Sequence, residues 1–141
     1  MNILRSGVDI IEIDRLAKVN HAIRQRFLKR VYTPLELEIA GDSNASLAGR
    51  FAAKEAVSKA LGSGIGHVRW QDIEIRRGAN GEPQLYLHGA ARQLADALGL
   101  TIWSVSISHS KTYAVAMVVA FGQRPQSSLA SLELHEHSDH Q

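Results

Sequence analysis

Residues 47–66, which read LAGRFAAKEAVSKALGSGIG, constrain the fold more than any other stretch of the chain. The stretch has few β-branched residues and ends in three alternating glycines, so it predicts a helix that stops at a glycine-rich break. Glu55 and Lys59 lie four residues apart, and alanines leave little bulk around the glutamate. A carboxylate in such small surroundings, flanked by cations, can hold a metal ion beside a polyanion. The alternative is an amphipathic helix with one ordinary surface ion pair.

The composition is typical of one soluble globular domain. The chain has 141 residues, of which 45% are apolar and 21% are charged. No window is as long and apolar as a membrane span, and acids interrupt the apolar run at the N-terminus, unlike in a signal peptide. The absence of cysteine excludes disulfides and thiolate chemistry. These features predict a cytoplasmic protein that makes no use of a membrane.

The charge divides the chain into a basic body and an acidic end. Residues 1–121 hold 15 Lys and Arg against 11 Asp and Glu, whereas residues 122–141 hold one Arg against three acids. A mildly basic body indicates an acidic partner or a phosphorylated ligand, and the scarcity of aromatic residues argues against nucleic acid. We predict one domain over residues 1–121 and a disordered, His-bearing tail over residues 122–141, to which no function is assigned.

The hydrophobic pattern predicts an α+β fold. Alternating or continuous apolar runs favour strands, apolar positions three or four apart favour helices, and Asn80-Gly81 favours a type I′ or related turn. We expect a mainly antiparallel sheet of about five strands with helices packed against it. The expected strands are 3–11, 72–77, 84–88, 101–108 and 113–121, the last fully buried, and the expected helices beside the central one are 14–28, 33–40 and 89–98.

Local signals refine several of these elements. Thr33 is the expected N-cap of a short helix, with Pro34 in its first position and Glu36 completing a capping box. Residues 41–46 are an expected polar connector. In the helix over 89–98, the residues expected to point inward are Ala90, Leu94, Ala97 and Leu98.

Asp9 is the second candidate for chemistry because it lies inside the apolar run of the first strand. An acid there is costly unless something positive meets it, so Asp9 is either a metal ligand or a residue at a bulge or strand end. Asp9 and Glu55 together suit Mg²⁺, which takes its remaining ligands from water and substrate phosphates. We therefore expect metal-assisted transfer at a phosphate, with the phosphates neutralised by Arg50, Lys54 and Lys59. His109 is either a further phosphate donor or a merely exposed turn histidine.

Four ordered blocks resemble one enzyme family. They are GVDIIEIDR (7–15), RFAAKEAVSKALGSGIG (50–66), WQDIEIRRGANGEP (70–83) and SVSISHSKTYAVA (104–116). In order and spacing they resemble the short bacterial holo-[acyl-carrier-protein] synthases of the 4′-phosphopantetheinyl transferase superfamily. The resemblance implies that the chain moves the 4′-phosphopantetheine arm of coenzyme A onto a serine of an acyl carrier protein. It also implies release of adenosine 3′,5′-bisphosphate and a role in fatty acid biosynthesis.

The same resemblance implies roles for individual residues. Asp9 and Glu55 match the magnesium ligands, and Lys59 matches a catalytic lysine that contacts the phosphates. The serine proton would go to Glu55 or to a magnesium-bound water relayed by it, and we favour the water because a bound carboxylate is a poor base. The positions matching the nucleotide site are Arg50, Lys54, Gly64 and His109, and those matching the carrier-protein docking face are Arg15, Arg24 and Arg26.

Family members of this length are usually trimers with the coenzyme at subunit interfaces, so a homotrimer is expected. An alternative from another class is a non-catalytic module that binds coenzyme A or an acidic protein helix. Loss of Asp9 or Glu55 would favour that module, but the chain retains both.

Overall fold

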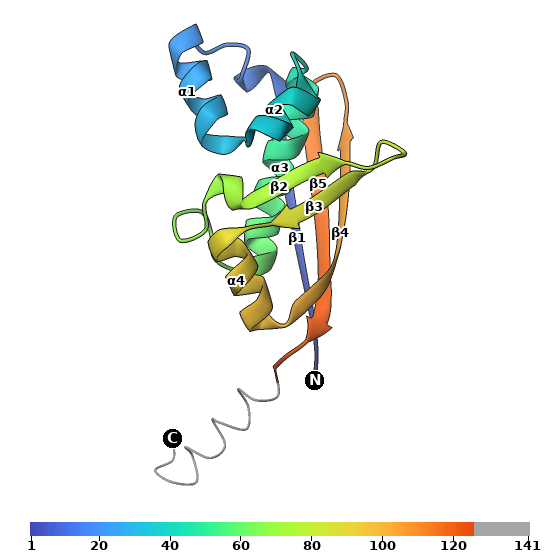
Figure 1. Cartoon of the computed structure of the whole chain (residues 1–141). Helices are drawn as coiled ribbons and strands as arrows, with labels where there is room; N and C mark the ends of the chain where they lie inside the picture. The colour runs from blue at the N-terminus through green and yellow to red at the C-terminus, as the bar shows by residue number, and fades with distance from the viewer. Residues whose placement is uncertain (126–141) are drawn as a thin grey trace.

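The computed structural model describes residues 1–125, and within them it has four α helices and five strands (Figure 1). The α+β prediction is confirmed, and all strand pairs are antiparallel. The five strands form two sheets rather than one, a three-stranded sheet in the order β1-β5-β4 and a hairpin of β2 and β3. The elements are β1 Asn2–Glu12, α1 His21–Val31, α2 Pro34–Ala40, α3 Asn44–Leu61, β2 Ile73–Arg77, β3 Pro83–Leu87, α4 Gly89–Leu98, β4 Leu100–His109 and β5 Tyr113–Gln123, with short 3₁₀ helices at Ile13–Arg15 and Trp70–Asp72.

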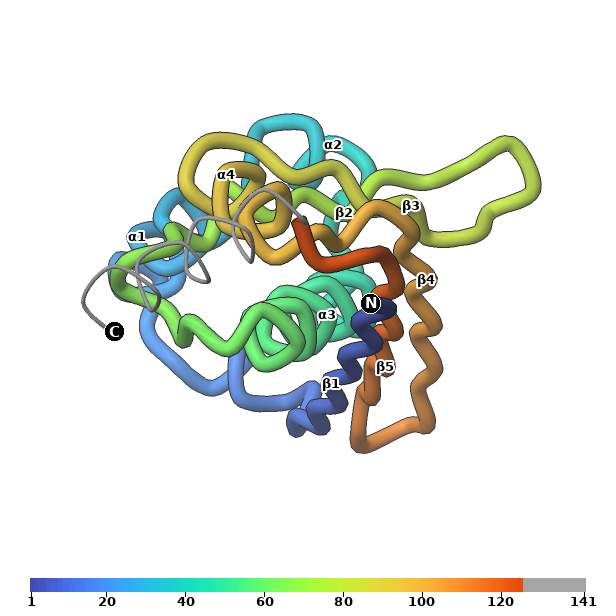
Figure 2. Tube along the Cα trace, turned by 90° about the horizontal axis from the view of Figure 1, so that it is seen from below, coloured from blue at the N-terminus to red at the C-terminus, as the bar shows by residue number. Residues whose placement is uncertain are grey.

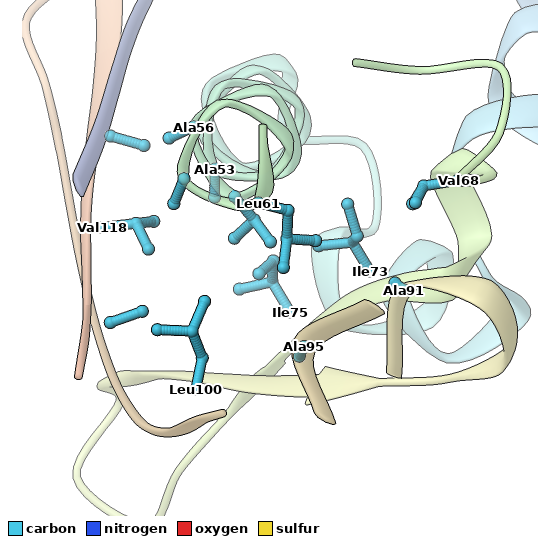
Figure 3. Packing of buried hydrophobic residues seen from close by; sticks show 14 of the residues in the cluster. Ala53, Ala56, Leu61, Val68, Ile73, Ile75, Ala91, Ala95, Leu100 and Val118 are labelled. Carbon is cyan, nitrogen blue, oxygen red and sulfur yellow. The ribbon is translucent and has the colours of Figure 1, made fainter. Parts of the chain in front are cut away.

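Helix α3 is the centre of the molecule and lies between the two sheets (Figure 2). Its alanines at 52, 53, 56 and 60 have no exposed surface. On one side they face Val118 of β5, and on the other the core continues to Ile73 and Ile75 of β2 (Figure 3). Small side chains on α3 therefore let both sheets approach one helix.

The contact between α3 and β1 is the closest of these approaches. A methyl group added at Gly7 would lie only 1.9 Å from the carbonyl oxygen of Ala56. Gly7 is two residues from Asp9 in sequence, and Ala56 directly follows Glu55. The packing of β1 on α3 thus fixes how far apart these two carboxylates can lie.

Several predicted helix ends are confirmed. The side chain of Thr33 accepts from the N–H of Glu36 at 3.2 Å, and the N–H of Thr33 donates to Glu36 Oε1 at 2.9 Å, which completes the capping box before α2. Gly62 ends α3 in the left-handed conformation with φ 76°.

Two helix starts were predicted wrongly. Helix α1 begins at His21 rather than residue 14, because the side chain of Asn20 accepts from the N–H of Ile23 at 2.9 Å and caps the helix there. Helix α3 begins at Asn44, inside the expected connector, because Ser43 Oγ accepts from the N–H of Ser46 at 3.1 Å. In both cases a local N-cap set the boundary.

Strand β5 differs from its prediction in burial and in length. Its residues alternate between buried and more exposed, with Met117 52% exposed and Phe121 37% exposed, because α3 covers only one face of the sheet. The strand continues to Gln123, so the first two residues of the predicted tail belong to the sheet. Residues 126–141 of that tail lie outside the described residues.

The hairpin and α4 also refine the prediction. Ile73 pairs with Leu87 and Ile75 with Leu85, as expected. The turn is a three-residue loop rather than a type I′ turn, since the N–H of Gly78 donates to the carbonyl of Glu82 at 2.7 Å. In α4 the predicted Leu94 and Leu98 pack against the core, but the fully buried residues are Ala91 and Ala95 and the predicted Ala97 is exposed, so the inward face was right in part. Among residues 1–125, none of the helices has the length and apolar character needed to cross a bilayer.

The close approach at Gly7 leads to a stability prediction. Gly7→Ala is expected to lower the free energy of unfolding by about 3 kcal/mol, because the clashing atom belongs to helix backbone and cannot rotate away. Urea unfolding measures the change, with Ser6→Ala on the exposed side of the same strand as the control. An unchanged urea midpoint for Gly7→Ala would contradict the close contact.

Candidate active site

Asp9, Glu55 and Lys59 come together at the side of α3 that faces β1. The ammonium of Lys59 lies 3.1 Å from Asp9 Oδ1 and also donates to the carbonyl of Val8 at 2.9 Å. Burial, and then the charge of Asp9, raise the pKa of Glu55, while Lys59 opposes the rise. The charges of two acids separated by 46 positions in the sequence therefore interact, and Lys59 forms an ion pair with Asp9.

The donor set fits Mg²⁺. Within residues 1–125 no three metal-ligating side chains gather, so a cation at this group would have two carboxylates from the protein. Mg²⁺ is commonly bound by one or two carboxylates together with water and substrate phosphate oxygens. A divalent cation would also remove the repulsion between Asp9 and Glu55 that contributes to the raised pKa of Glu55.

Lys54 lies apart from this group despite preceding Glu55 in sequence. Its side chain has no exposed surface and forms an ion pair with Glu36 at 2.8 Å. It also donates to the carbonyls of Trp70, at 3.1 Å, and Ile73. All three protons of the ammonium thus have protein partners, so in this conformation Lys54 does not reach a phosphate.

Arg50 is nearly as buried, with 7% of its surface exposed. It donates from Nε to the carbonyl of Ile75 at 3.0 Å and from a terminal nitrogen to Ser46 Oγ at 2.6 Å. Part of the side chain nevertheless lines an open cavity of about 300 Å³ that His109 also lines. Arg50 therefore both holds β2 and contributes charge to this cavity.

We call the cavity lined by Arg50 and His109 the hairpin cavity. Besides Arg50 and His109, its lining includes Arg76 and Arg77 from β2, two cations that the sequence analysis did not select. Their signal was a pair of arginines directly before the glycine-containing turn of the hairpin. Burial lowers the pKa of Arg50, although an arginine remains charged at neutral pH. The hairpin cavity is suited to an anion.

The Asp9 group and the hairpin cavity lie on different sides of α3. Asp9 and Ile107 both pair with Ala116, so β5 separates their strands, and their backbones are roughly 10 Å apart. On the inner face Lys59 meets β1, whereas Gly49 meets Ile107 of β4. One chain therefore does not bring His109 and Arg50 to the carboxylate pair.

Residues 14–30, which include Arg15, Arg24 and Arg26 and which we call the basic segment, border an apolar cavity. This cavity, of about 240 Å³, is lined by Arg15 and by apolar residues including Ile11 and Phe51. Ile11 follows Asp9 by two residues on β1, and Phe51 precedes Glu55 by one helical turn, so the cavity adjoins the carboxylate pair. Arg26 is exposed, while Arg24 donates to the carbonyl of Leu16 at 3.1 Å.

Gly64 lies in the exposed loop after α3 with φ 67°, and no atom lies within 4 Å of where its Cβ would be. The positive φ explains why glycine suits the position. Gly64 lies just beyond the end of α3, the end that carries Lys59 and the Asp9 group. The hairpin cavity, in contrast, borders the first half of the helix.

Comparison with known proteins identifies the class. Residues 5–118 match the model of the 4′-phosphopantetheinyl transferase superfamily. This match covers most of the chain, and the chain therefore belongs to that superfamily of transferases.

Individual relatives narrow the class. A holo-[acyl-carrier-protein] synthase from Herpetosiphon aurantiacus is 50% identical over 126 residues, covering 84% of this chain and 99% of that protein. The corresponding protein of Moorella thermoacetica is 50% identical over 121 residues, covering 82% and 92%. The family within the superfamily is thus that of the holo-[acyl-carrier-protein] synthases, which are enzymes.

Solved structures agree with this assignment. The Helicobacter pylori holo-[acyl-carrier-protein] synthase in complex with coenzyme A has a TM-score of 0.74 and 36% identity, covering 82% of this chain and 98% of that one. The Bacillus anthracis enzyme, in complex with coenzyme A (3′,5′-ADP), has a TM-score of 0.70 and 38% identity, covering 87% and 100%.

The raised pKa of Glu55 predicts a pH-dependent stability. A group whose pKa is higher in the folded state favours folding while it is protonated and loses that contribution as pH rises. Without added metal, Glu55→Gln is therefore expected to be more stable than the wild type at about pH 7, with the difference shrinking toward about pH 3.5. Urea midpoints at both pH values measure it, with exposed Glu38→Gln as the control. A pH-independent difference would show that Glu55 ionises without penalty.

Proposed function

We propose that this chain transfers the 4′-phosphopantetheine group of coenzyme A to a serine of an acidic acyl carrier protein, with Mg²⁺, and so serves fatty acid biosynthesis. The observation that carries the proposal is the Asp9, Glu55 and Lys59 group beside an apolar cavity rimmed by Arg15. The names of the relatives, and the coenzyme A in two of their structures, supply the substrate class.

In this reaction the serine oxygen forms a bond to the phosphorus at the pantetheine end of the pyrophosphate. The bond from that phosphorus to the bridging oxygen breaks, and adenosine 3′,5′-bisphosphate leaves with the electron pair. When bound, Mg²⁺ would be held by Asp9 and Glu55 and would withdraw charge from the pyrophosphate.

The protein side chains supply the remaining chemistry. The ammonium of Lys59 is 53% exposed while it contacts Asp9, so it can also donate to a phosphate oxygen of the leaving group. Glu55 accepts the serine proton, directly or through a water that it relays, and the water is favoured because a carboxylate that holds Mg²⁺ is a poor base. Lys54 has no direct part, since its three protons already have partners.

The carrier protein docks on the basic segment. Arg15 lies at the rim of the apolar cavity, and Arg26 extends the positive surface along α1, so an acidic helix with one apolar anchor would fit this face. Arg24 contributes charge while its bond to the Leu16 carbonyl fixes the start of α1. Docking there brings the partner close to the carboxylate pair, because Ile11 and Phe51 line the apolar cavity and are also near neighbours of Asp9 and Glu55.

A complete site requires two copies of the chain, and the proposed assembly is a homotrimer. The hairpin cavity and the Asp9 group lie on different sides of α3. In the proposed assembly the cations of one copy therefore bind the same nucleotide as the carboxylates of the next copy. The outer face of the three-stranded sheet is apolar and open, with Val8 57%, Ile10 63% and Ile102 62% exposed. Packing these faces together would cover them in a closed assembly.

The transfer itself is tested with coenzyme A, Mg²⁺ and an apo acyl carrier protein. We expect the carrier to gain the mass of one phosphopantetheine group and a chelator to prevent the gain, because Asp9 and Glu55 alone repel the pyrophosphate. Arg15→Glu is expected to raise KM for the carrier about tenfold while leaving coenzyme A binding unchanged, since like charges would then meet.

The same assay separates the proposal from a binding module. Binding of coenzyme A with no mass gain on any carrier tested would leave only the non-catalytic reading. A mass gain that persists after exhaustive chelation would remove the metal from the proposal. Equal carrier KM values for Arg15→Glu and the wild type would place the docking face elsewhere.

The shared site is tested by complementation. Glu55→Gln and His109→Ala are each expected to be inactive alone, but their co-expression should restore about a quarter of the activity, because a quarter of interfaces would then carry both intact residues. Co-expressed Glu55→Gln and Asp9→Asn form the matched control, since both residues belong to one side of the interface. Restored activity in the control, or none in the test pair, would contradict the two-copy site.

A further inference from the structure

Glu36 is a buried carboxylate that the proposed reaction does not use. Its side chain and that of Lys54 both have no exposed surface, and they lie 2.8 Å apart. The sequence indicated only a capping role, through Thr33. A buried ion pair gains little net stability over apolar residues of similar volume, so its presence calls for another explanation.

The bonds of Glu36 join three elements. Oε1 accepts from the N–H of Thr33 at 2.9 Å and from Lys54, and Oε2 accepts from the N–H of Ile75 at 2.8 Å. One carboxylate on α2 is thus bonded to α3 and to β2. It also fills a ladder position that would otherwise leave the Ile75 amide buried without a partner.

Helix α3 also bonds directly to β2 and to the short 3₁₀ helix before it. Lys54 donates to the carbonyls of Trp70 and Ile73, and Arg50 donates to the carbonyl of Ile75 at 3.0 Å. Ile75 therefore receives a bond from α3 on its carbonyl and gives one to α2 from its amide. The strand cannot shift along α3 without breaking several charge-assisted bonds in a buried region.

The chain continues from Ile75 directly into Arg76 and Arg77, which line the hairpin cavity with Arg50 and His109. Arg76 is further fixed by Glu74, at 3.0 Å, and by the ring of Tyr86. Glu74 in turn accepts from Thr33 Oγ1 at 2.6 Å, so the cap of α2 reaches the same strand a second time.

We propose that Glu36 is a positioning residue for nucleotide binding: through Lys54 and the Ile75 amide it sets where β2 presents Arg76 and Arg77 beside Arg50. This inference rests on the proposed function for the identity of the anion, which is the adenosine bisphosphate part of coenzyme A. Lys54 then acts on the nucleotide only through the position of β2.

Glu36→Gln separates this role from direct phosphate binding by Lys54. If Lys54 contacted the phosphates, removing the charge of Glu36 would free its ammonium and leave nucleotide affinity unchanged or higher. If Glu36 positions β2, affinity falls, and we expect adenosine 3′,5′-bisphosphate to bind about tenfold more weakly by titration calorimetry. KM for coenzyme A should rise more than kcat falls, because the reacting groups lie on the other side of α3.

Two further variants keep the test decisive. Glu36→Leu combined with Lys54→Met removes both charges at similar volume but also removes the partners of the Ile75 amide and the Ile73 carbonyl, so we expect a lower melting temperature and, in the folded protein, weak nucleotide binding. Tyr32→Phe removes a different buried bond on α3, to the carbonyl of Leu47 at 2.5 Å. It should lower the melting temperature without changing nucleotide affinity.

Amide hydrogen exchange reads the position of β2 without any ligand. Exchange at Ile75, Arg76 and Arg77 should accelerate in Glu36→Gln and stay unchanged in Tyr32→Phe. Unchanged exchange, or nucleotide affinity equal to the wild type in folded Glu36→Gln, would overturn the inference. If the wild type bound no nucleotide, the proposed function would be wrong. The exchange measurement would still decide whether Glu36 positions the strand.

Discussion

The contact between the backbone of β1 at Gly7 and that of α3 at Ala56 is the constraint on which the site depends. A single methyl group does not fit between them. Because Asp9 and Glu55 are close neighbours of these two residues in sequence, the contact that packs the core also brings the carboxylates together. Larger residues at either position would move β1 outward and separate the acids. Core packing and chemistry therefore share one determinant in this fold.

The two clusters of charge around α3, one half-exposed and one fully buried, differ in their energetics. At Asp9 and Glu55, burial and then the neighbouring like charge raise the pKa of Glu55, which costs folding free energy at neutral pH. At Glu36 and Lys54 opposite charges are fully enclosed and every donor of the ammonium has an acceptor. The first arrangement is unfavourable without a bound cation, and such unfavourable groupings of like charge are typical of functional sites. The second is satisfied without a ligand and suits a fixed support.

Features set by neighbouring residues could be predicted from the sequence, whereas features that depend on tertiary contacts could not. The capping box at Thr33 and the glycine that ends α3 follow from local chemistry, and both are present. The apolar run of β5 predicts a fully buried strand, and only the tertiary structure shows that one face of the strand lies away from α3. The position of Lys54 beside Glu55 predicts a phosphate ligand, and only the structure shows that Lys54 pairs with Glu36 of α2 instead. Arg76 and Arg77 were missed because a pair of arginines before a turn is equally typical of a solvated strand end, and only the tertiary structure shows that they line a cavity.

The geometry of α3 explains why neighbouring charges on it have unlike roles. Successive residues on a helix point about 100° apart, so Lys54 and Glu55 diverge although they are adjacent. Glu55 and Lys59, four residues apart, share the side that faces β1, whereas Arg50 and Lys54 share the side that faces β2. One helix thus serves a carboxylate group on one side and the hairpin cavity on the other. Under the proposed function a pyrophosphate nucleotide uses both sides of α3, and because these sides face apart along a single helix, the proposal requires a second copy to complete the site.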